Sequence, residues 1–149
     1  MRVATDIVFD LDTKRVVDAS NVNAASTTTQ TLYVENLYLL RCNIYENASE
    51  NTKLNLTAAT SFKLAIGLLD STPMVQSLNS QFVAADWASW DVATGMICAR
   101  INTDSSALET WLGTKEWASC YVEVKATDPV SESTICMFPV TIRNTVYDV

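Results

Sequence analysis

The last third of the chain alternates apolar and polar residues on both sides of one turn, which is the pattern of a β-hairpin. Apolar residues occupy every second position over 120–126 and again over 136–142. Because successive side chains of a strand point to opposite faces, this alternation predicts two half-buried antiparallel strands over residues 119–143. Pro139 cannot donate a hydrogen bond to a ladder, so we expect it at an edge position or a bulge.

Strand-like segments recur upstream of the hairpin. They cover residues 5–11, 31–45, 61–69 and 96–102. Alternation or high apolar content predicts strands in all of them, with one bent strand or two short ones in the second segment. A short helix is an alternative for the third. Many strands and few helical signals favour a mainly β chain, and we predict an antiparallel β-sandwich.

One short helix is predicted near residues 104–112. Ser106 and Glu109 have the spacing of a capping box at its start. Trp111 shares the apolar face of this helix, and Trp117 lies beside the next strand. We expect both tryptophans to fill the core.

The polar segment 18–30 follows neither the period of a strand nor that of a helix. A stretch of this length without a pattern is often functional or mobile, so we interpret it as a long loop or an extended arm. An arm could order on a neighbouring subunit through Asn21, Asn23, Thr27 and Thr28. A simple surface loop is the alternative.

Length and charge restrict the class of protein. The chain has 149 residues, the usual size of one domain, so a single domain over residues 1–149 is predicted. Ten basic residues against seventeen acidic ones leave a net charge of −7, which argues against binding to nucleic acid or to an anionic membrane. No signal peptide or membrane-spanning run is recognisable, so a protein made in the cytosol is expected.

The chain lacks the residues that several kinds of catalysis require. The chain has no histidine, which removes Ser-His-Asp and Cys-His pairs and the commonest general base near neutral pH. Its three glycines are isolated, so no phosphate-binding loop or dinucleotide fingerprint is present, and we expect no cofactor. We expect no enzymatic activity and no catalytic residues. Carboxylate-dependent glycan hydrolysis is the enzymatic alternative that the sequence leaves open.

Four cysteines, Cys42, Cys98, Cys120 and Cys136, form no CxxC pair. The last two lie on apolar positions of the predicted hairpin, where small buried thiols are common. We predict free core thiols, with a Cys120–Cys136 disulfide as the alternative if the fold brings them together. No metal site is expected, because zinc would need all four cysteines to converge and the N-terminal aspartates lack the glycine and glutamate of a calcium loop.

Tryptophan offers the most specific candidates for binding. Trp87 and Trp90 lie in a polar loop and are flanked by Asp86 and Asp91. Large rigid aromatic residues dominate interface hot spots and also stack on sugars. These four residues are therefore candidate contacts for a protein partner or a glycan.

Several C-terminal segments match a pattern of a strand, a short helix and a terminal hairpin. The matching residues are Asp86-Trp87, Gly-Met-Ile-Cys-Ala-Arg-Ile-Asn at 95–102, Leu-Gly-Thr at 112–114, Cys-Tyr-Val-Glu-Val at 120–124 and Phe-Pro-Val-Thr-Ile-Arg-Asn at 138–144. In these residues the chain resembles small β domains of tailed-bacteriophage tail, baseplate and fibre proteins, over about its last 65 residues.

The resemblance implies a role in virion architecture. Such domains are typically attachment modules of longer fibre chains and often form symmetric oligomers. Because this chain ends at Val149, without room for a shaft and a receptor-binding tip, the resemblance implies an adaptor, a short fibre, a capsid-decoration protein or a baseplate part. We therefore expect a non-enzymatic virion structural protein that forms a homo-oligomer and docks to other virion proteins. The alternative is a carbohydrate-binding module involved in host-surface recognition.

Overall fold

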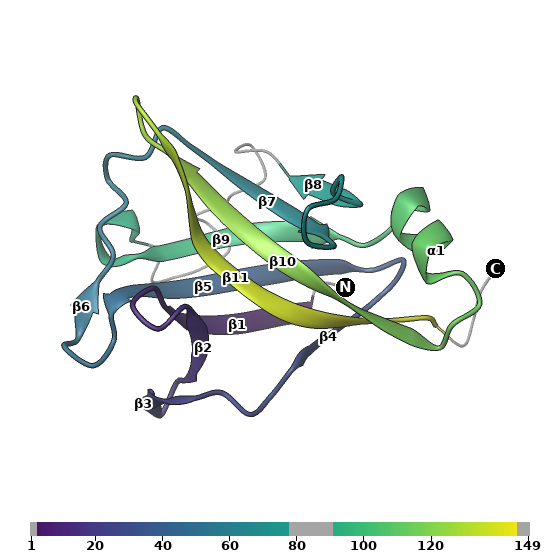
Figure 1. The fold of residues 1–149 in the computed structure, drawn as a ribbon, viewed down its shortest axis with the longest axis horizontal. Helices are drawn as coiled ribbons and strands as arrows, with labels where there is room; N and C mark the ends of the chain where they lie inside the picture. Colours follow the sequence, from purple (N-terminus) through teal and green to yellow (C-terminus); the bar gives the residue numbers. More distant parts are fainter. Residues whose placement is uncertain (1–2, 78–90, 146–149) are drawn as a thin grey trace.

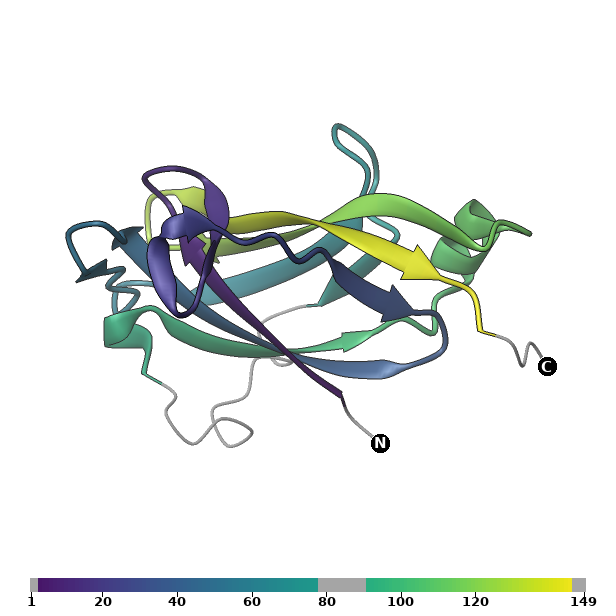
Figure 2. The same ribbon diagram turned by 90° about the horizontal axis from the view of Figure 1, so that it is seen from below.

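Two β-sheets lie face to face in this protein and enclose its core. The computed structural model describes residues 3–77 and 91–145. Figure 1 shows the C-terminal hairpin crossing in front of the other sheet, and Figure 2 shows the two layers from below. The prediction of a mainly β sandwich with one short helix and a terminal hairpin is confirmed. The predicted antiparallel pairing holds except for one parallel pair in each sheet.

The first sheet combines N-terminal strands with one later strand. Its order is β3-β2-β1-β5-β6, and β9 also pairs with β5. Neighbouring strands are antiparallel except β1 and β5, which run parallel. The strands are β1 (Val3–Asp10), β2 (Arg15–Asp18), β3 (Asn21–Ala25), β5 (Leu37–Asn47), β6 (Thr52–Lys53) and β9 (Met96–Asn102).

The second sheet is built on the predicted hairpin. Its order is β4-β11-β10-β7-β8, and β4 runs parallel to β11. The strands are β4 (Gln30–Tyr33), β7 (Ser61–Gly67), β8 (Val75–Ser77), β10 (Trp117–Thr127) and β11 (Glu132–Arg143). The chain enters this sheet at β4 and returns to the first sheet at β5, and this crossover allows β1 and β5 to lie parallel as neighbours.

The segment 18–30 is more ordered than its composition predicts. It was expected to be a structureless loop or arm, but it contains β3 and the first residue of β4. In the described part of the chain β3 pairs with β2 alone, at the edge of the first sheet. An edge strand is exposed to solvent on its unpaired side and can have polar side chains on both faces. Backbone pairing with β2 therefore holds β3 in place, although β3 has no apolar face.

In two other segments, the structure decides between the predicted alternatives. The apolar segment 31–45 forms two strands, β4 and β5, rather than one. Glu35 lies between them with a φ of 60°, which turns the chain. The segment 61–69 contains the strand β7 and no helix, because its backbone pairs with β10 and β8.

The helix α1 (Ser106–Leu112) begins at a different cap from the predicted one. Ser105 is the N-cap, and its hydroxyl accepts a hydrogen bond from the Leu108 backbone N–H at 3.3 Å. A capping residue precedes the first helical residue and has an extended backbone, which Ser105 provides with φ −134° and ψ 122°. The predicted capping box of Ser106 and Glu109 is therefore wrong.

The core lies between the sheets and is made by the inward side chain of every second residue. On the hairpin these are the even-numbered positions that the sequence predicts, and all of them are buried. The largest fully buried side chains come from both sheets and from α1: Ile7, Leu32, Leu40, Ile44, Leu64, Ile66, Ile97, Ile101, Leu108, Leu112, Val122 and Ile142.

All four cysteines are free and buried, as predicted for core thiols. The ladder pairs Cys120 with Val140 and Cys136 with Val124, so the two cysteines of the hairpin are not cross-strand partners. Burial raises the pKa of the Cys120 thiol to about 11. A thiol that is protonated at neutral pH is a poor nucleophile, which agrees with a packing role.

Pro139 lies at an open edge of β11, as its missing N–H predicts. The Val34 backbone N–H donates to the Arg143 carbonyl oxygen, so odd-numbered residues in this part of β11 face the side of β4. The pairing with β4 begins only at Val140. The Pro139 nitrogen therefore faces the β4 side at a position where no strand of the described residues pairs with β11, so its missing N–H leaves no acceptor unpaired.

Candidate docking surface

The two sheets differ in their outward faces. On the first sheet, the outward side chains of Leu39, Tyr45 and Cys98 are buried. On the second sheet, Tyr33 and Trp117 point outward and are 44% and 54% exposed. The second sheet thus presents large apolar groups to solvent.

Exposed apolar side chains concentrate around this outward face. Met137 lies on the face itself, and Leu68 and Leu69, from the loop after β7, line the same hollow as Met137. Five of the seven large apolar side chains that are exposed in residues 3–77 and 91–145 lie on or beside the face: Tyr33, Leu68, Leu69, Trp117 and Met137. A cluster of this kind marks an interaction surface, whereas isolated exposed apolar residues are ordinary.

One end of the face carries a row of three residues from three adjacent strands. Tyr33 of β4 is in register with Arg143 of β11, and Arg143 is in register with Trp117 of β10. Residues in register across a sheet point to the same side, so the three side chains share the outward face. We call these three residues the aromatic row. Trp, Tyr and Arg are the residue types that most often dominate binding energy at interfaces.

The surroundings of the aromatic row are held by hydrogen bonds. The Arg143 guanidinium contacts the Glu116 carboxylate at 2.6 Å. The Asn144 backbone N–H donates to the Glu116 carbonyl oxygen at 3.0 Å, and its side-chain amide donates to the carbonyl oxygens of Gly113 and Lys115. These bonds fasten the loop after α1 to the end of β11, so the row stands on a fixed backbone.

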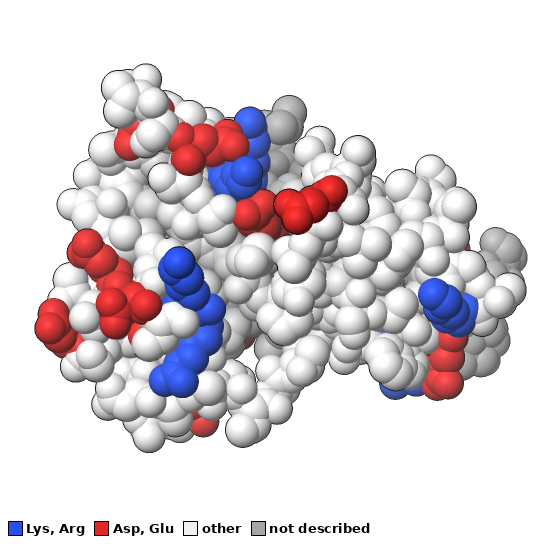
Figure 3. Space-filling view, viewed as in Figure 1, with Lys and Arg blue, Asp and Glu red and all other residues white. Residues whose placement is uncertain are grey.

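The middle of the face carries no charge. From the row toward the hairpin tip, the outward residues of β10 and β11 are Ser119, Tyr121, Pro139 and Thr141. The first charged outward residue along β10 is Glu123. Figure 3 shows the result, because uncharged atoms cover most of the centre and right of this side of the molecule. An uncharged sheet surface suits packing against another protein.

Two connected hollows lie on the other half of the face. The loop 68–73 lines one side of a hollow of about 290 Å³, and Tyr121 and Met137 also line it. The second, of about 270 Å³, is lined by Lys125 and Glu132 among others. Each lies at the lower end of the roughly 300–1,000 Å³ of typical small-molecule sites. Hollows of this size can receive single side chains of a partner.

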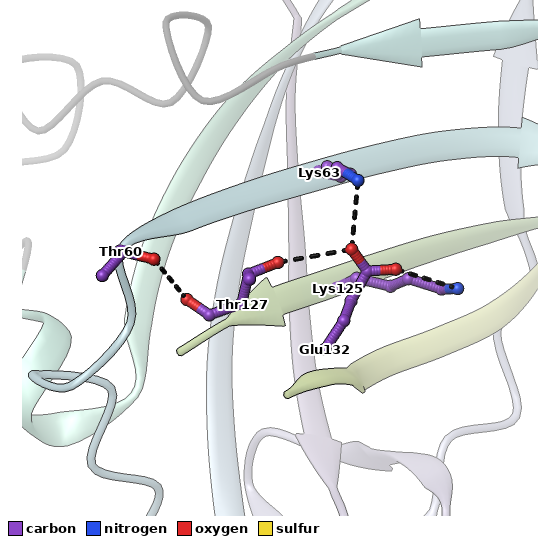
Figure 4. A network of polar contacts seen from close by, with 5 residues as sticks. All are labelled: Thr60, Lys63, Lys125, Thr127 and Glu132. Carbon is purple, nitrogen blue, oxygen red and sulfur yellow. Dashed lines mark hydrogen bonds and ion pairs between the residues drawn. The ribbon is translucent and has the colours of Figure 1, made fainter. Parts of the chain in front are cut away.

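A polar network closes this end of the sheet (Figure 4). Glu132 accepts a hydrogen bond from Lys63 at 3.0 Å and lies 3.5 Å from the Lys125 ammonium. The Thr127 hydroxyl donates to Glu132, and the Thr60 hydroxyl donates to the Thr127 carbonyl oxygen. The hydrogen bond and charge of Lys63 hold the pKa of Glu132 below its usual range. The carboxylate is therefore ionised at neutral pH and is poorly suited to act as a general acid.

The predicted tryptophan site is only partly within the described structure. Asp86, Trp87 and Trp90 lie outside the described residues. Asp91 is described, and its carboxylate accepts a hydrogen bond from the Ala93 backbone N–H at 3.0 Å. It caps the 3-10 helix η2 (Val92–Thr94), so this carboxylate has a structural partner within its own turn.

The predicted arm contacts lie on the β2–β3 hairpin and the loop after it. The Asn21 side chain accepts from the Asn23 backbone N–H at 3.2 Å, and the Asn23 carbonyl accepts from Arg15. The Thr28 backbone N–H donates to the Ser26 hydroxyl. Thr27 lies in the same loop. The role of these residues in assembly stays a prediction.

The prediction that both remaining tryptophans fill the core is wrong for Trp117. Trp111 is half-buried and packs against the core, whereas Trp117 is more than half exposed. The hairpin alternation contains the signal, because the inward positions of β10 are even-numbered and 117 is odd. Arg143 and Tyr33 could not be found in this way, since their neighbourhood depends on the pairing of β4 with β11.

Two further features of the described residues concern ligands and membranes. No three His, Cys, Asp or Glu side chains in residues 3–77 and 91–145 are grouped so that they could hold a metal ion. Among the same residues, no helix has the length and apolar character needed to cross a membrane.

Fold and surface together define a β-sandwich whose second sheet carries exposed apolar side chains on its outward face. No known protein family matches the chain, and no curated protein matches its sequence. Among solved structures, the chain is similar to the N-terminal domain of phage TP901-1 ORF48, with 9% sequence identity and a TM-score of 0.48. The match covers 97% of this chain and 98% of that chain. A likeness at this level concerns overall fold and assigns no function.

Proposed function

We propose that this chain is a non-enzymatic structural protein of a tailed-bacteriophage virion, which self-associates and docks to other virion proteins. The observation that carries the proposal is the concentration of exposed large apolar side chains on one sheet face. A soluble domain rarely leaves such a cluster in water unless a partner covers it in the working assembly. The resemblance of the C-terminal segments to phage tail, baseplate and fibre domains supports the virion as that assembly.

The character of the face supports a binding role. It is uncharged in the middle, has the aromatic row at one end, and has two hollows at the other. Protein interfaces combine such apolar centres with a polar rim. An adaptor, a short fibre, a capsid-decoration protein and a baseplate part would all use a face of this kind.

Quantitative mass spectrometry of purified phage particles tests this proposal. The chain should be present at a fixed ratio to the other tail or capsid proteins, and the ratio should separate a baseplate part from a capsid decoration. A phage protein that is abundant in the lysate but belongs to no particle serves as the control. Absence of the chain from particles that are free of this control contradicts the proposal.

A carbohydrate-binding module is the second candidate, and the exposure of Trp117 and Tyr33 favours it. Aromatic side chains on a flat sheet stack well on sugar rings. A glycan array should then show binding that Trp117→Ala removes, or that the double substitution Trp87→Ala and Trp90→Ala removes, without unfolding. If the parent chain binds no glycan, this candidate is eliminated.

A further inference from the structure

We propose that the aromatic row and the uncharged surface beside it pack against the same surface of a second copy of this chain, across a two-fold axis. This inference rests on the proposed function, because it identifies one contact through which the virion protein self-associates. In a two-fold contact both copies use the same patch, so the patch must be complementary to itself. The charges and the anchors of this face meet that condition.

The first property is a pair of opposite charges at the row. Arg143 and Glu116 form an ion pair of 2.6 Å, and their side chains are 38% and 76% exposed. An exposed pair of this kind contributes little to folding and exchanges partners readily. A two-fold axis beside the pair sets Arg143 of each copy against the partner's Glu116. Two intramolecular ion pairs are then exchanged for two intermolecular ones.

The second property is the local charge balance. The whole chain carries a net charge of −7, so two copies repel each other over most of their surfaces. At the row, Arg143 and Glu116 cancel, and the outward positions from there to Glu123 on β10 are uncharged. Two copies can therefore approach through this face without like charges meeting, which favours it over the acidic remainder of the surface.

The third property is a set of anchors on a fixed base. Trp117 and Tyr33 stand on either side of Arg143, two strands apart. Asn144 ties the backbone at Glu116 to the end of β11 with a hydrogen bond of 3.0 Å. Anchors that are already positioned lose less conformational freedom on binding, which strengthens the contact.

The size of the face limits the contact that two copies can make. From the row to Glu123, β10 and β11 run side by side, whereas β4 pairs only with residues 140–143 and β7 pairs only from Tyr121 onward. With strands about 4.8 Å apart and roughly 3.3 Å per residue, this part of the sheet covers about 330 Å² in projection. A standard interface buries about 800 Å² on each partner. The two-fold contact is therefore smaller than a permanent interface, and we expect a reversible dimer with a Kd on the order of micromolar.

Charge-reversal variants of the full chain, mixed in pairs, test the geometry by sedimentation equilibrium. R143E and E116R should each be monomeric at concentrations where the parent is dimeric, because like charges then meet across the axis. Mixed in equal amounts, they should form a heterodimer, since two positive groups on one copy face two negative groups on the other. D6R and R41E make the same changes in sign in the Arg41–Asp6 ion pair of the first sheet, which also measures 2.6 Å, and should leave the parent dimer intact.

A second variant measures the anchor. Trp117→Ala should raise the dimer Kd by roughly 30-fold or more, which is the effect of removing an interface hot spot. Circular dichroism and urea unfolding show whether each variant is folded, so that a loss of association is separated from a loss of structure.

Three results overturn the inference. The first is a parent chain that stays monomeric up to several hundred micromolar. The second is a mixture of R143E and E116R that fails to associate. The third is an R143E variant that by itself still dimerises like the parent. Glycan binding that requires Trp117 in a chain that never dimerises also overturns it and gives the face a different occupant. These failures are distinct from failure of the proposed function, which is decided by the presence of the chain in purified particles.

Discussion

Removal of the Asp10 carboxylate should test how the first sheet is held at its turns. Asp10 is only 3% exposed, and it accepts hydrogen bonds from the Asp12 N–H at 3.1 Å, the Ala48 N–H at 3.2 Å and the Thr13 hydroxyl at 2.8 Å. The carboxylate thereby joins the turn after β1 to the turn after β5. Its burial is unusual for a carboxylate and is explained by these three donors.

The size of the stability loss depends on whether water can replace the carboxylate as the hydrogen-bond acceptor of each donor. Ala48 is buried, so Asp10→Ala leaves its N–H without a partner, which costs about 1–3 kcal/mol. Asp12 and Thr13 are exposed, and water replaces their lost bonds at little cost. We expect Asp10→Ala to lower the free energy of unfolding by about 2–3 kcal/mol, a large part of the roughly 5–15 kcal/mol of a typical domain.

Urea unfolding at pH 7, followed by tryptophan fluorescence, measures this loss. Asp10→Asn keeps one acceptor oxygen and should lose less than Asp10→Ala, about 1 kcal/mol. Asp12→Ala removes an exposed carboxylate from the same turn and should change the unfolding free energy by less than about 0.5 kcal/mol. Equal losses for Asp10→Ala and Asp12→Ala refute the reasoning.

The same carboxylate predicts a dependence on pH. Burial by itself raises the pKa of Asp10, but hydrogen bonds from Thr13, Ala48 and Asp12 outweigh burial and lower the pKa below its usual value of 3.8. A group with a lowered folded-state pKa contributes stability above the unfolded pKa, and the contribution is lost as the pH falls through the folded pKa. The difference between parent and Asp10→Ala should therefore be constant near neutral pH and shrink below pH 3.8.

Three further changes give separate tests. Gly95→Ala should destabilise by about 2 kcal/mol or more in urea, because the added Cβ would lie 2.2 Å from the Ile44 carbonyl oxygen at a φ of 73°; a loss under about 0.5 kcal/mol contradicts this. Ser105→Ala should cost about 1 kcal/mol and Ser106→Ala almost nothing, and the reverse order would restore the predicted capping box. The Cys120 thiol, with a pKa of about 11, should react with a thiol reagent at pH 8 only when the chain unfolds, and rapid labelling of the folded chain would refute its burial.

The proposed docking surface depends on a feature of the strand pairing. Pro139 has no N–H to donate toward the side of β4, and the β4 pairing begins at the next residue. The ladder from there to Arg143 brings Tyr33 beside the end of the hairpin. Without this short parallel pairing, the hairpin would carry Arg143 and Trp117 but no aromatic residue on the other side of Arg143.

The hairpin itself could be predicted because its information is local. Alternation of period two specifies which side chains share a face, and the structure places Cys120, Val122 and Phe138 inside as predicted. Position 117 is odd, so the same alternation places Trp117 on the outward face. Its exposure could therefore have been predicted from the sequence, although large aromatic residues are usually expected in the core. For the helix, the cap was missed by one residue, since Ser105 and Ser106 differ only in backbone conformation.

The sequence by itself determined the mainly β class, the hairpin and the apolar positions that form the core. Tertiary structure decided that Tyr33, Arg143 and Trp117 stand in one row, and that the polar segment 18–30 contains an edge strand. The physical reason is that alternation reports which face a side chain takes within its own strand. The identity of the neighbouring strand depends on crossovers and register, which arise only when segments far apart in the chain compete for the same hydrogen bonds.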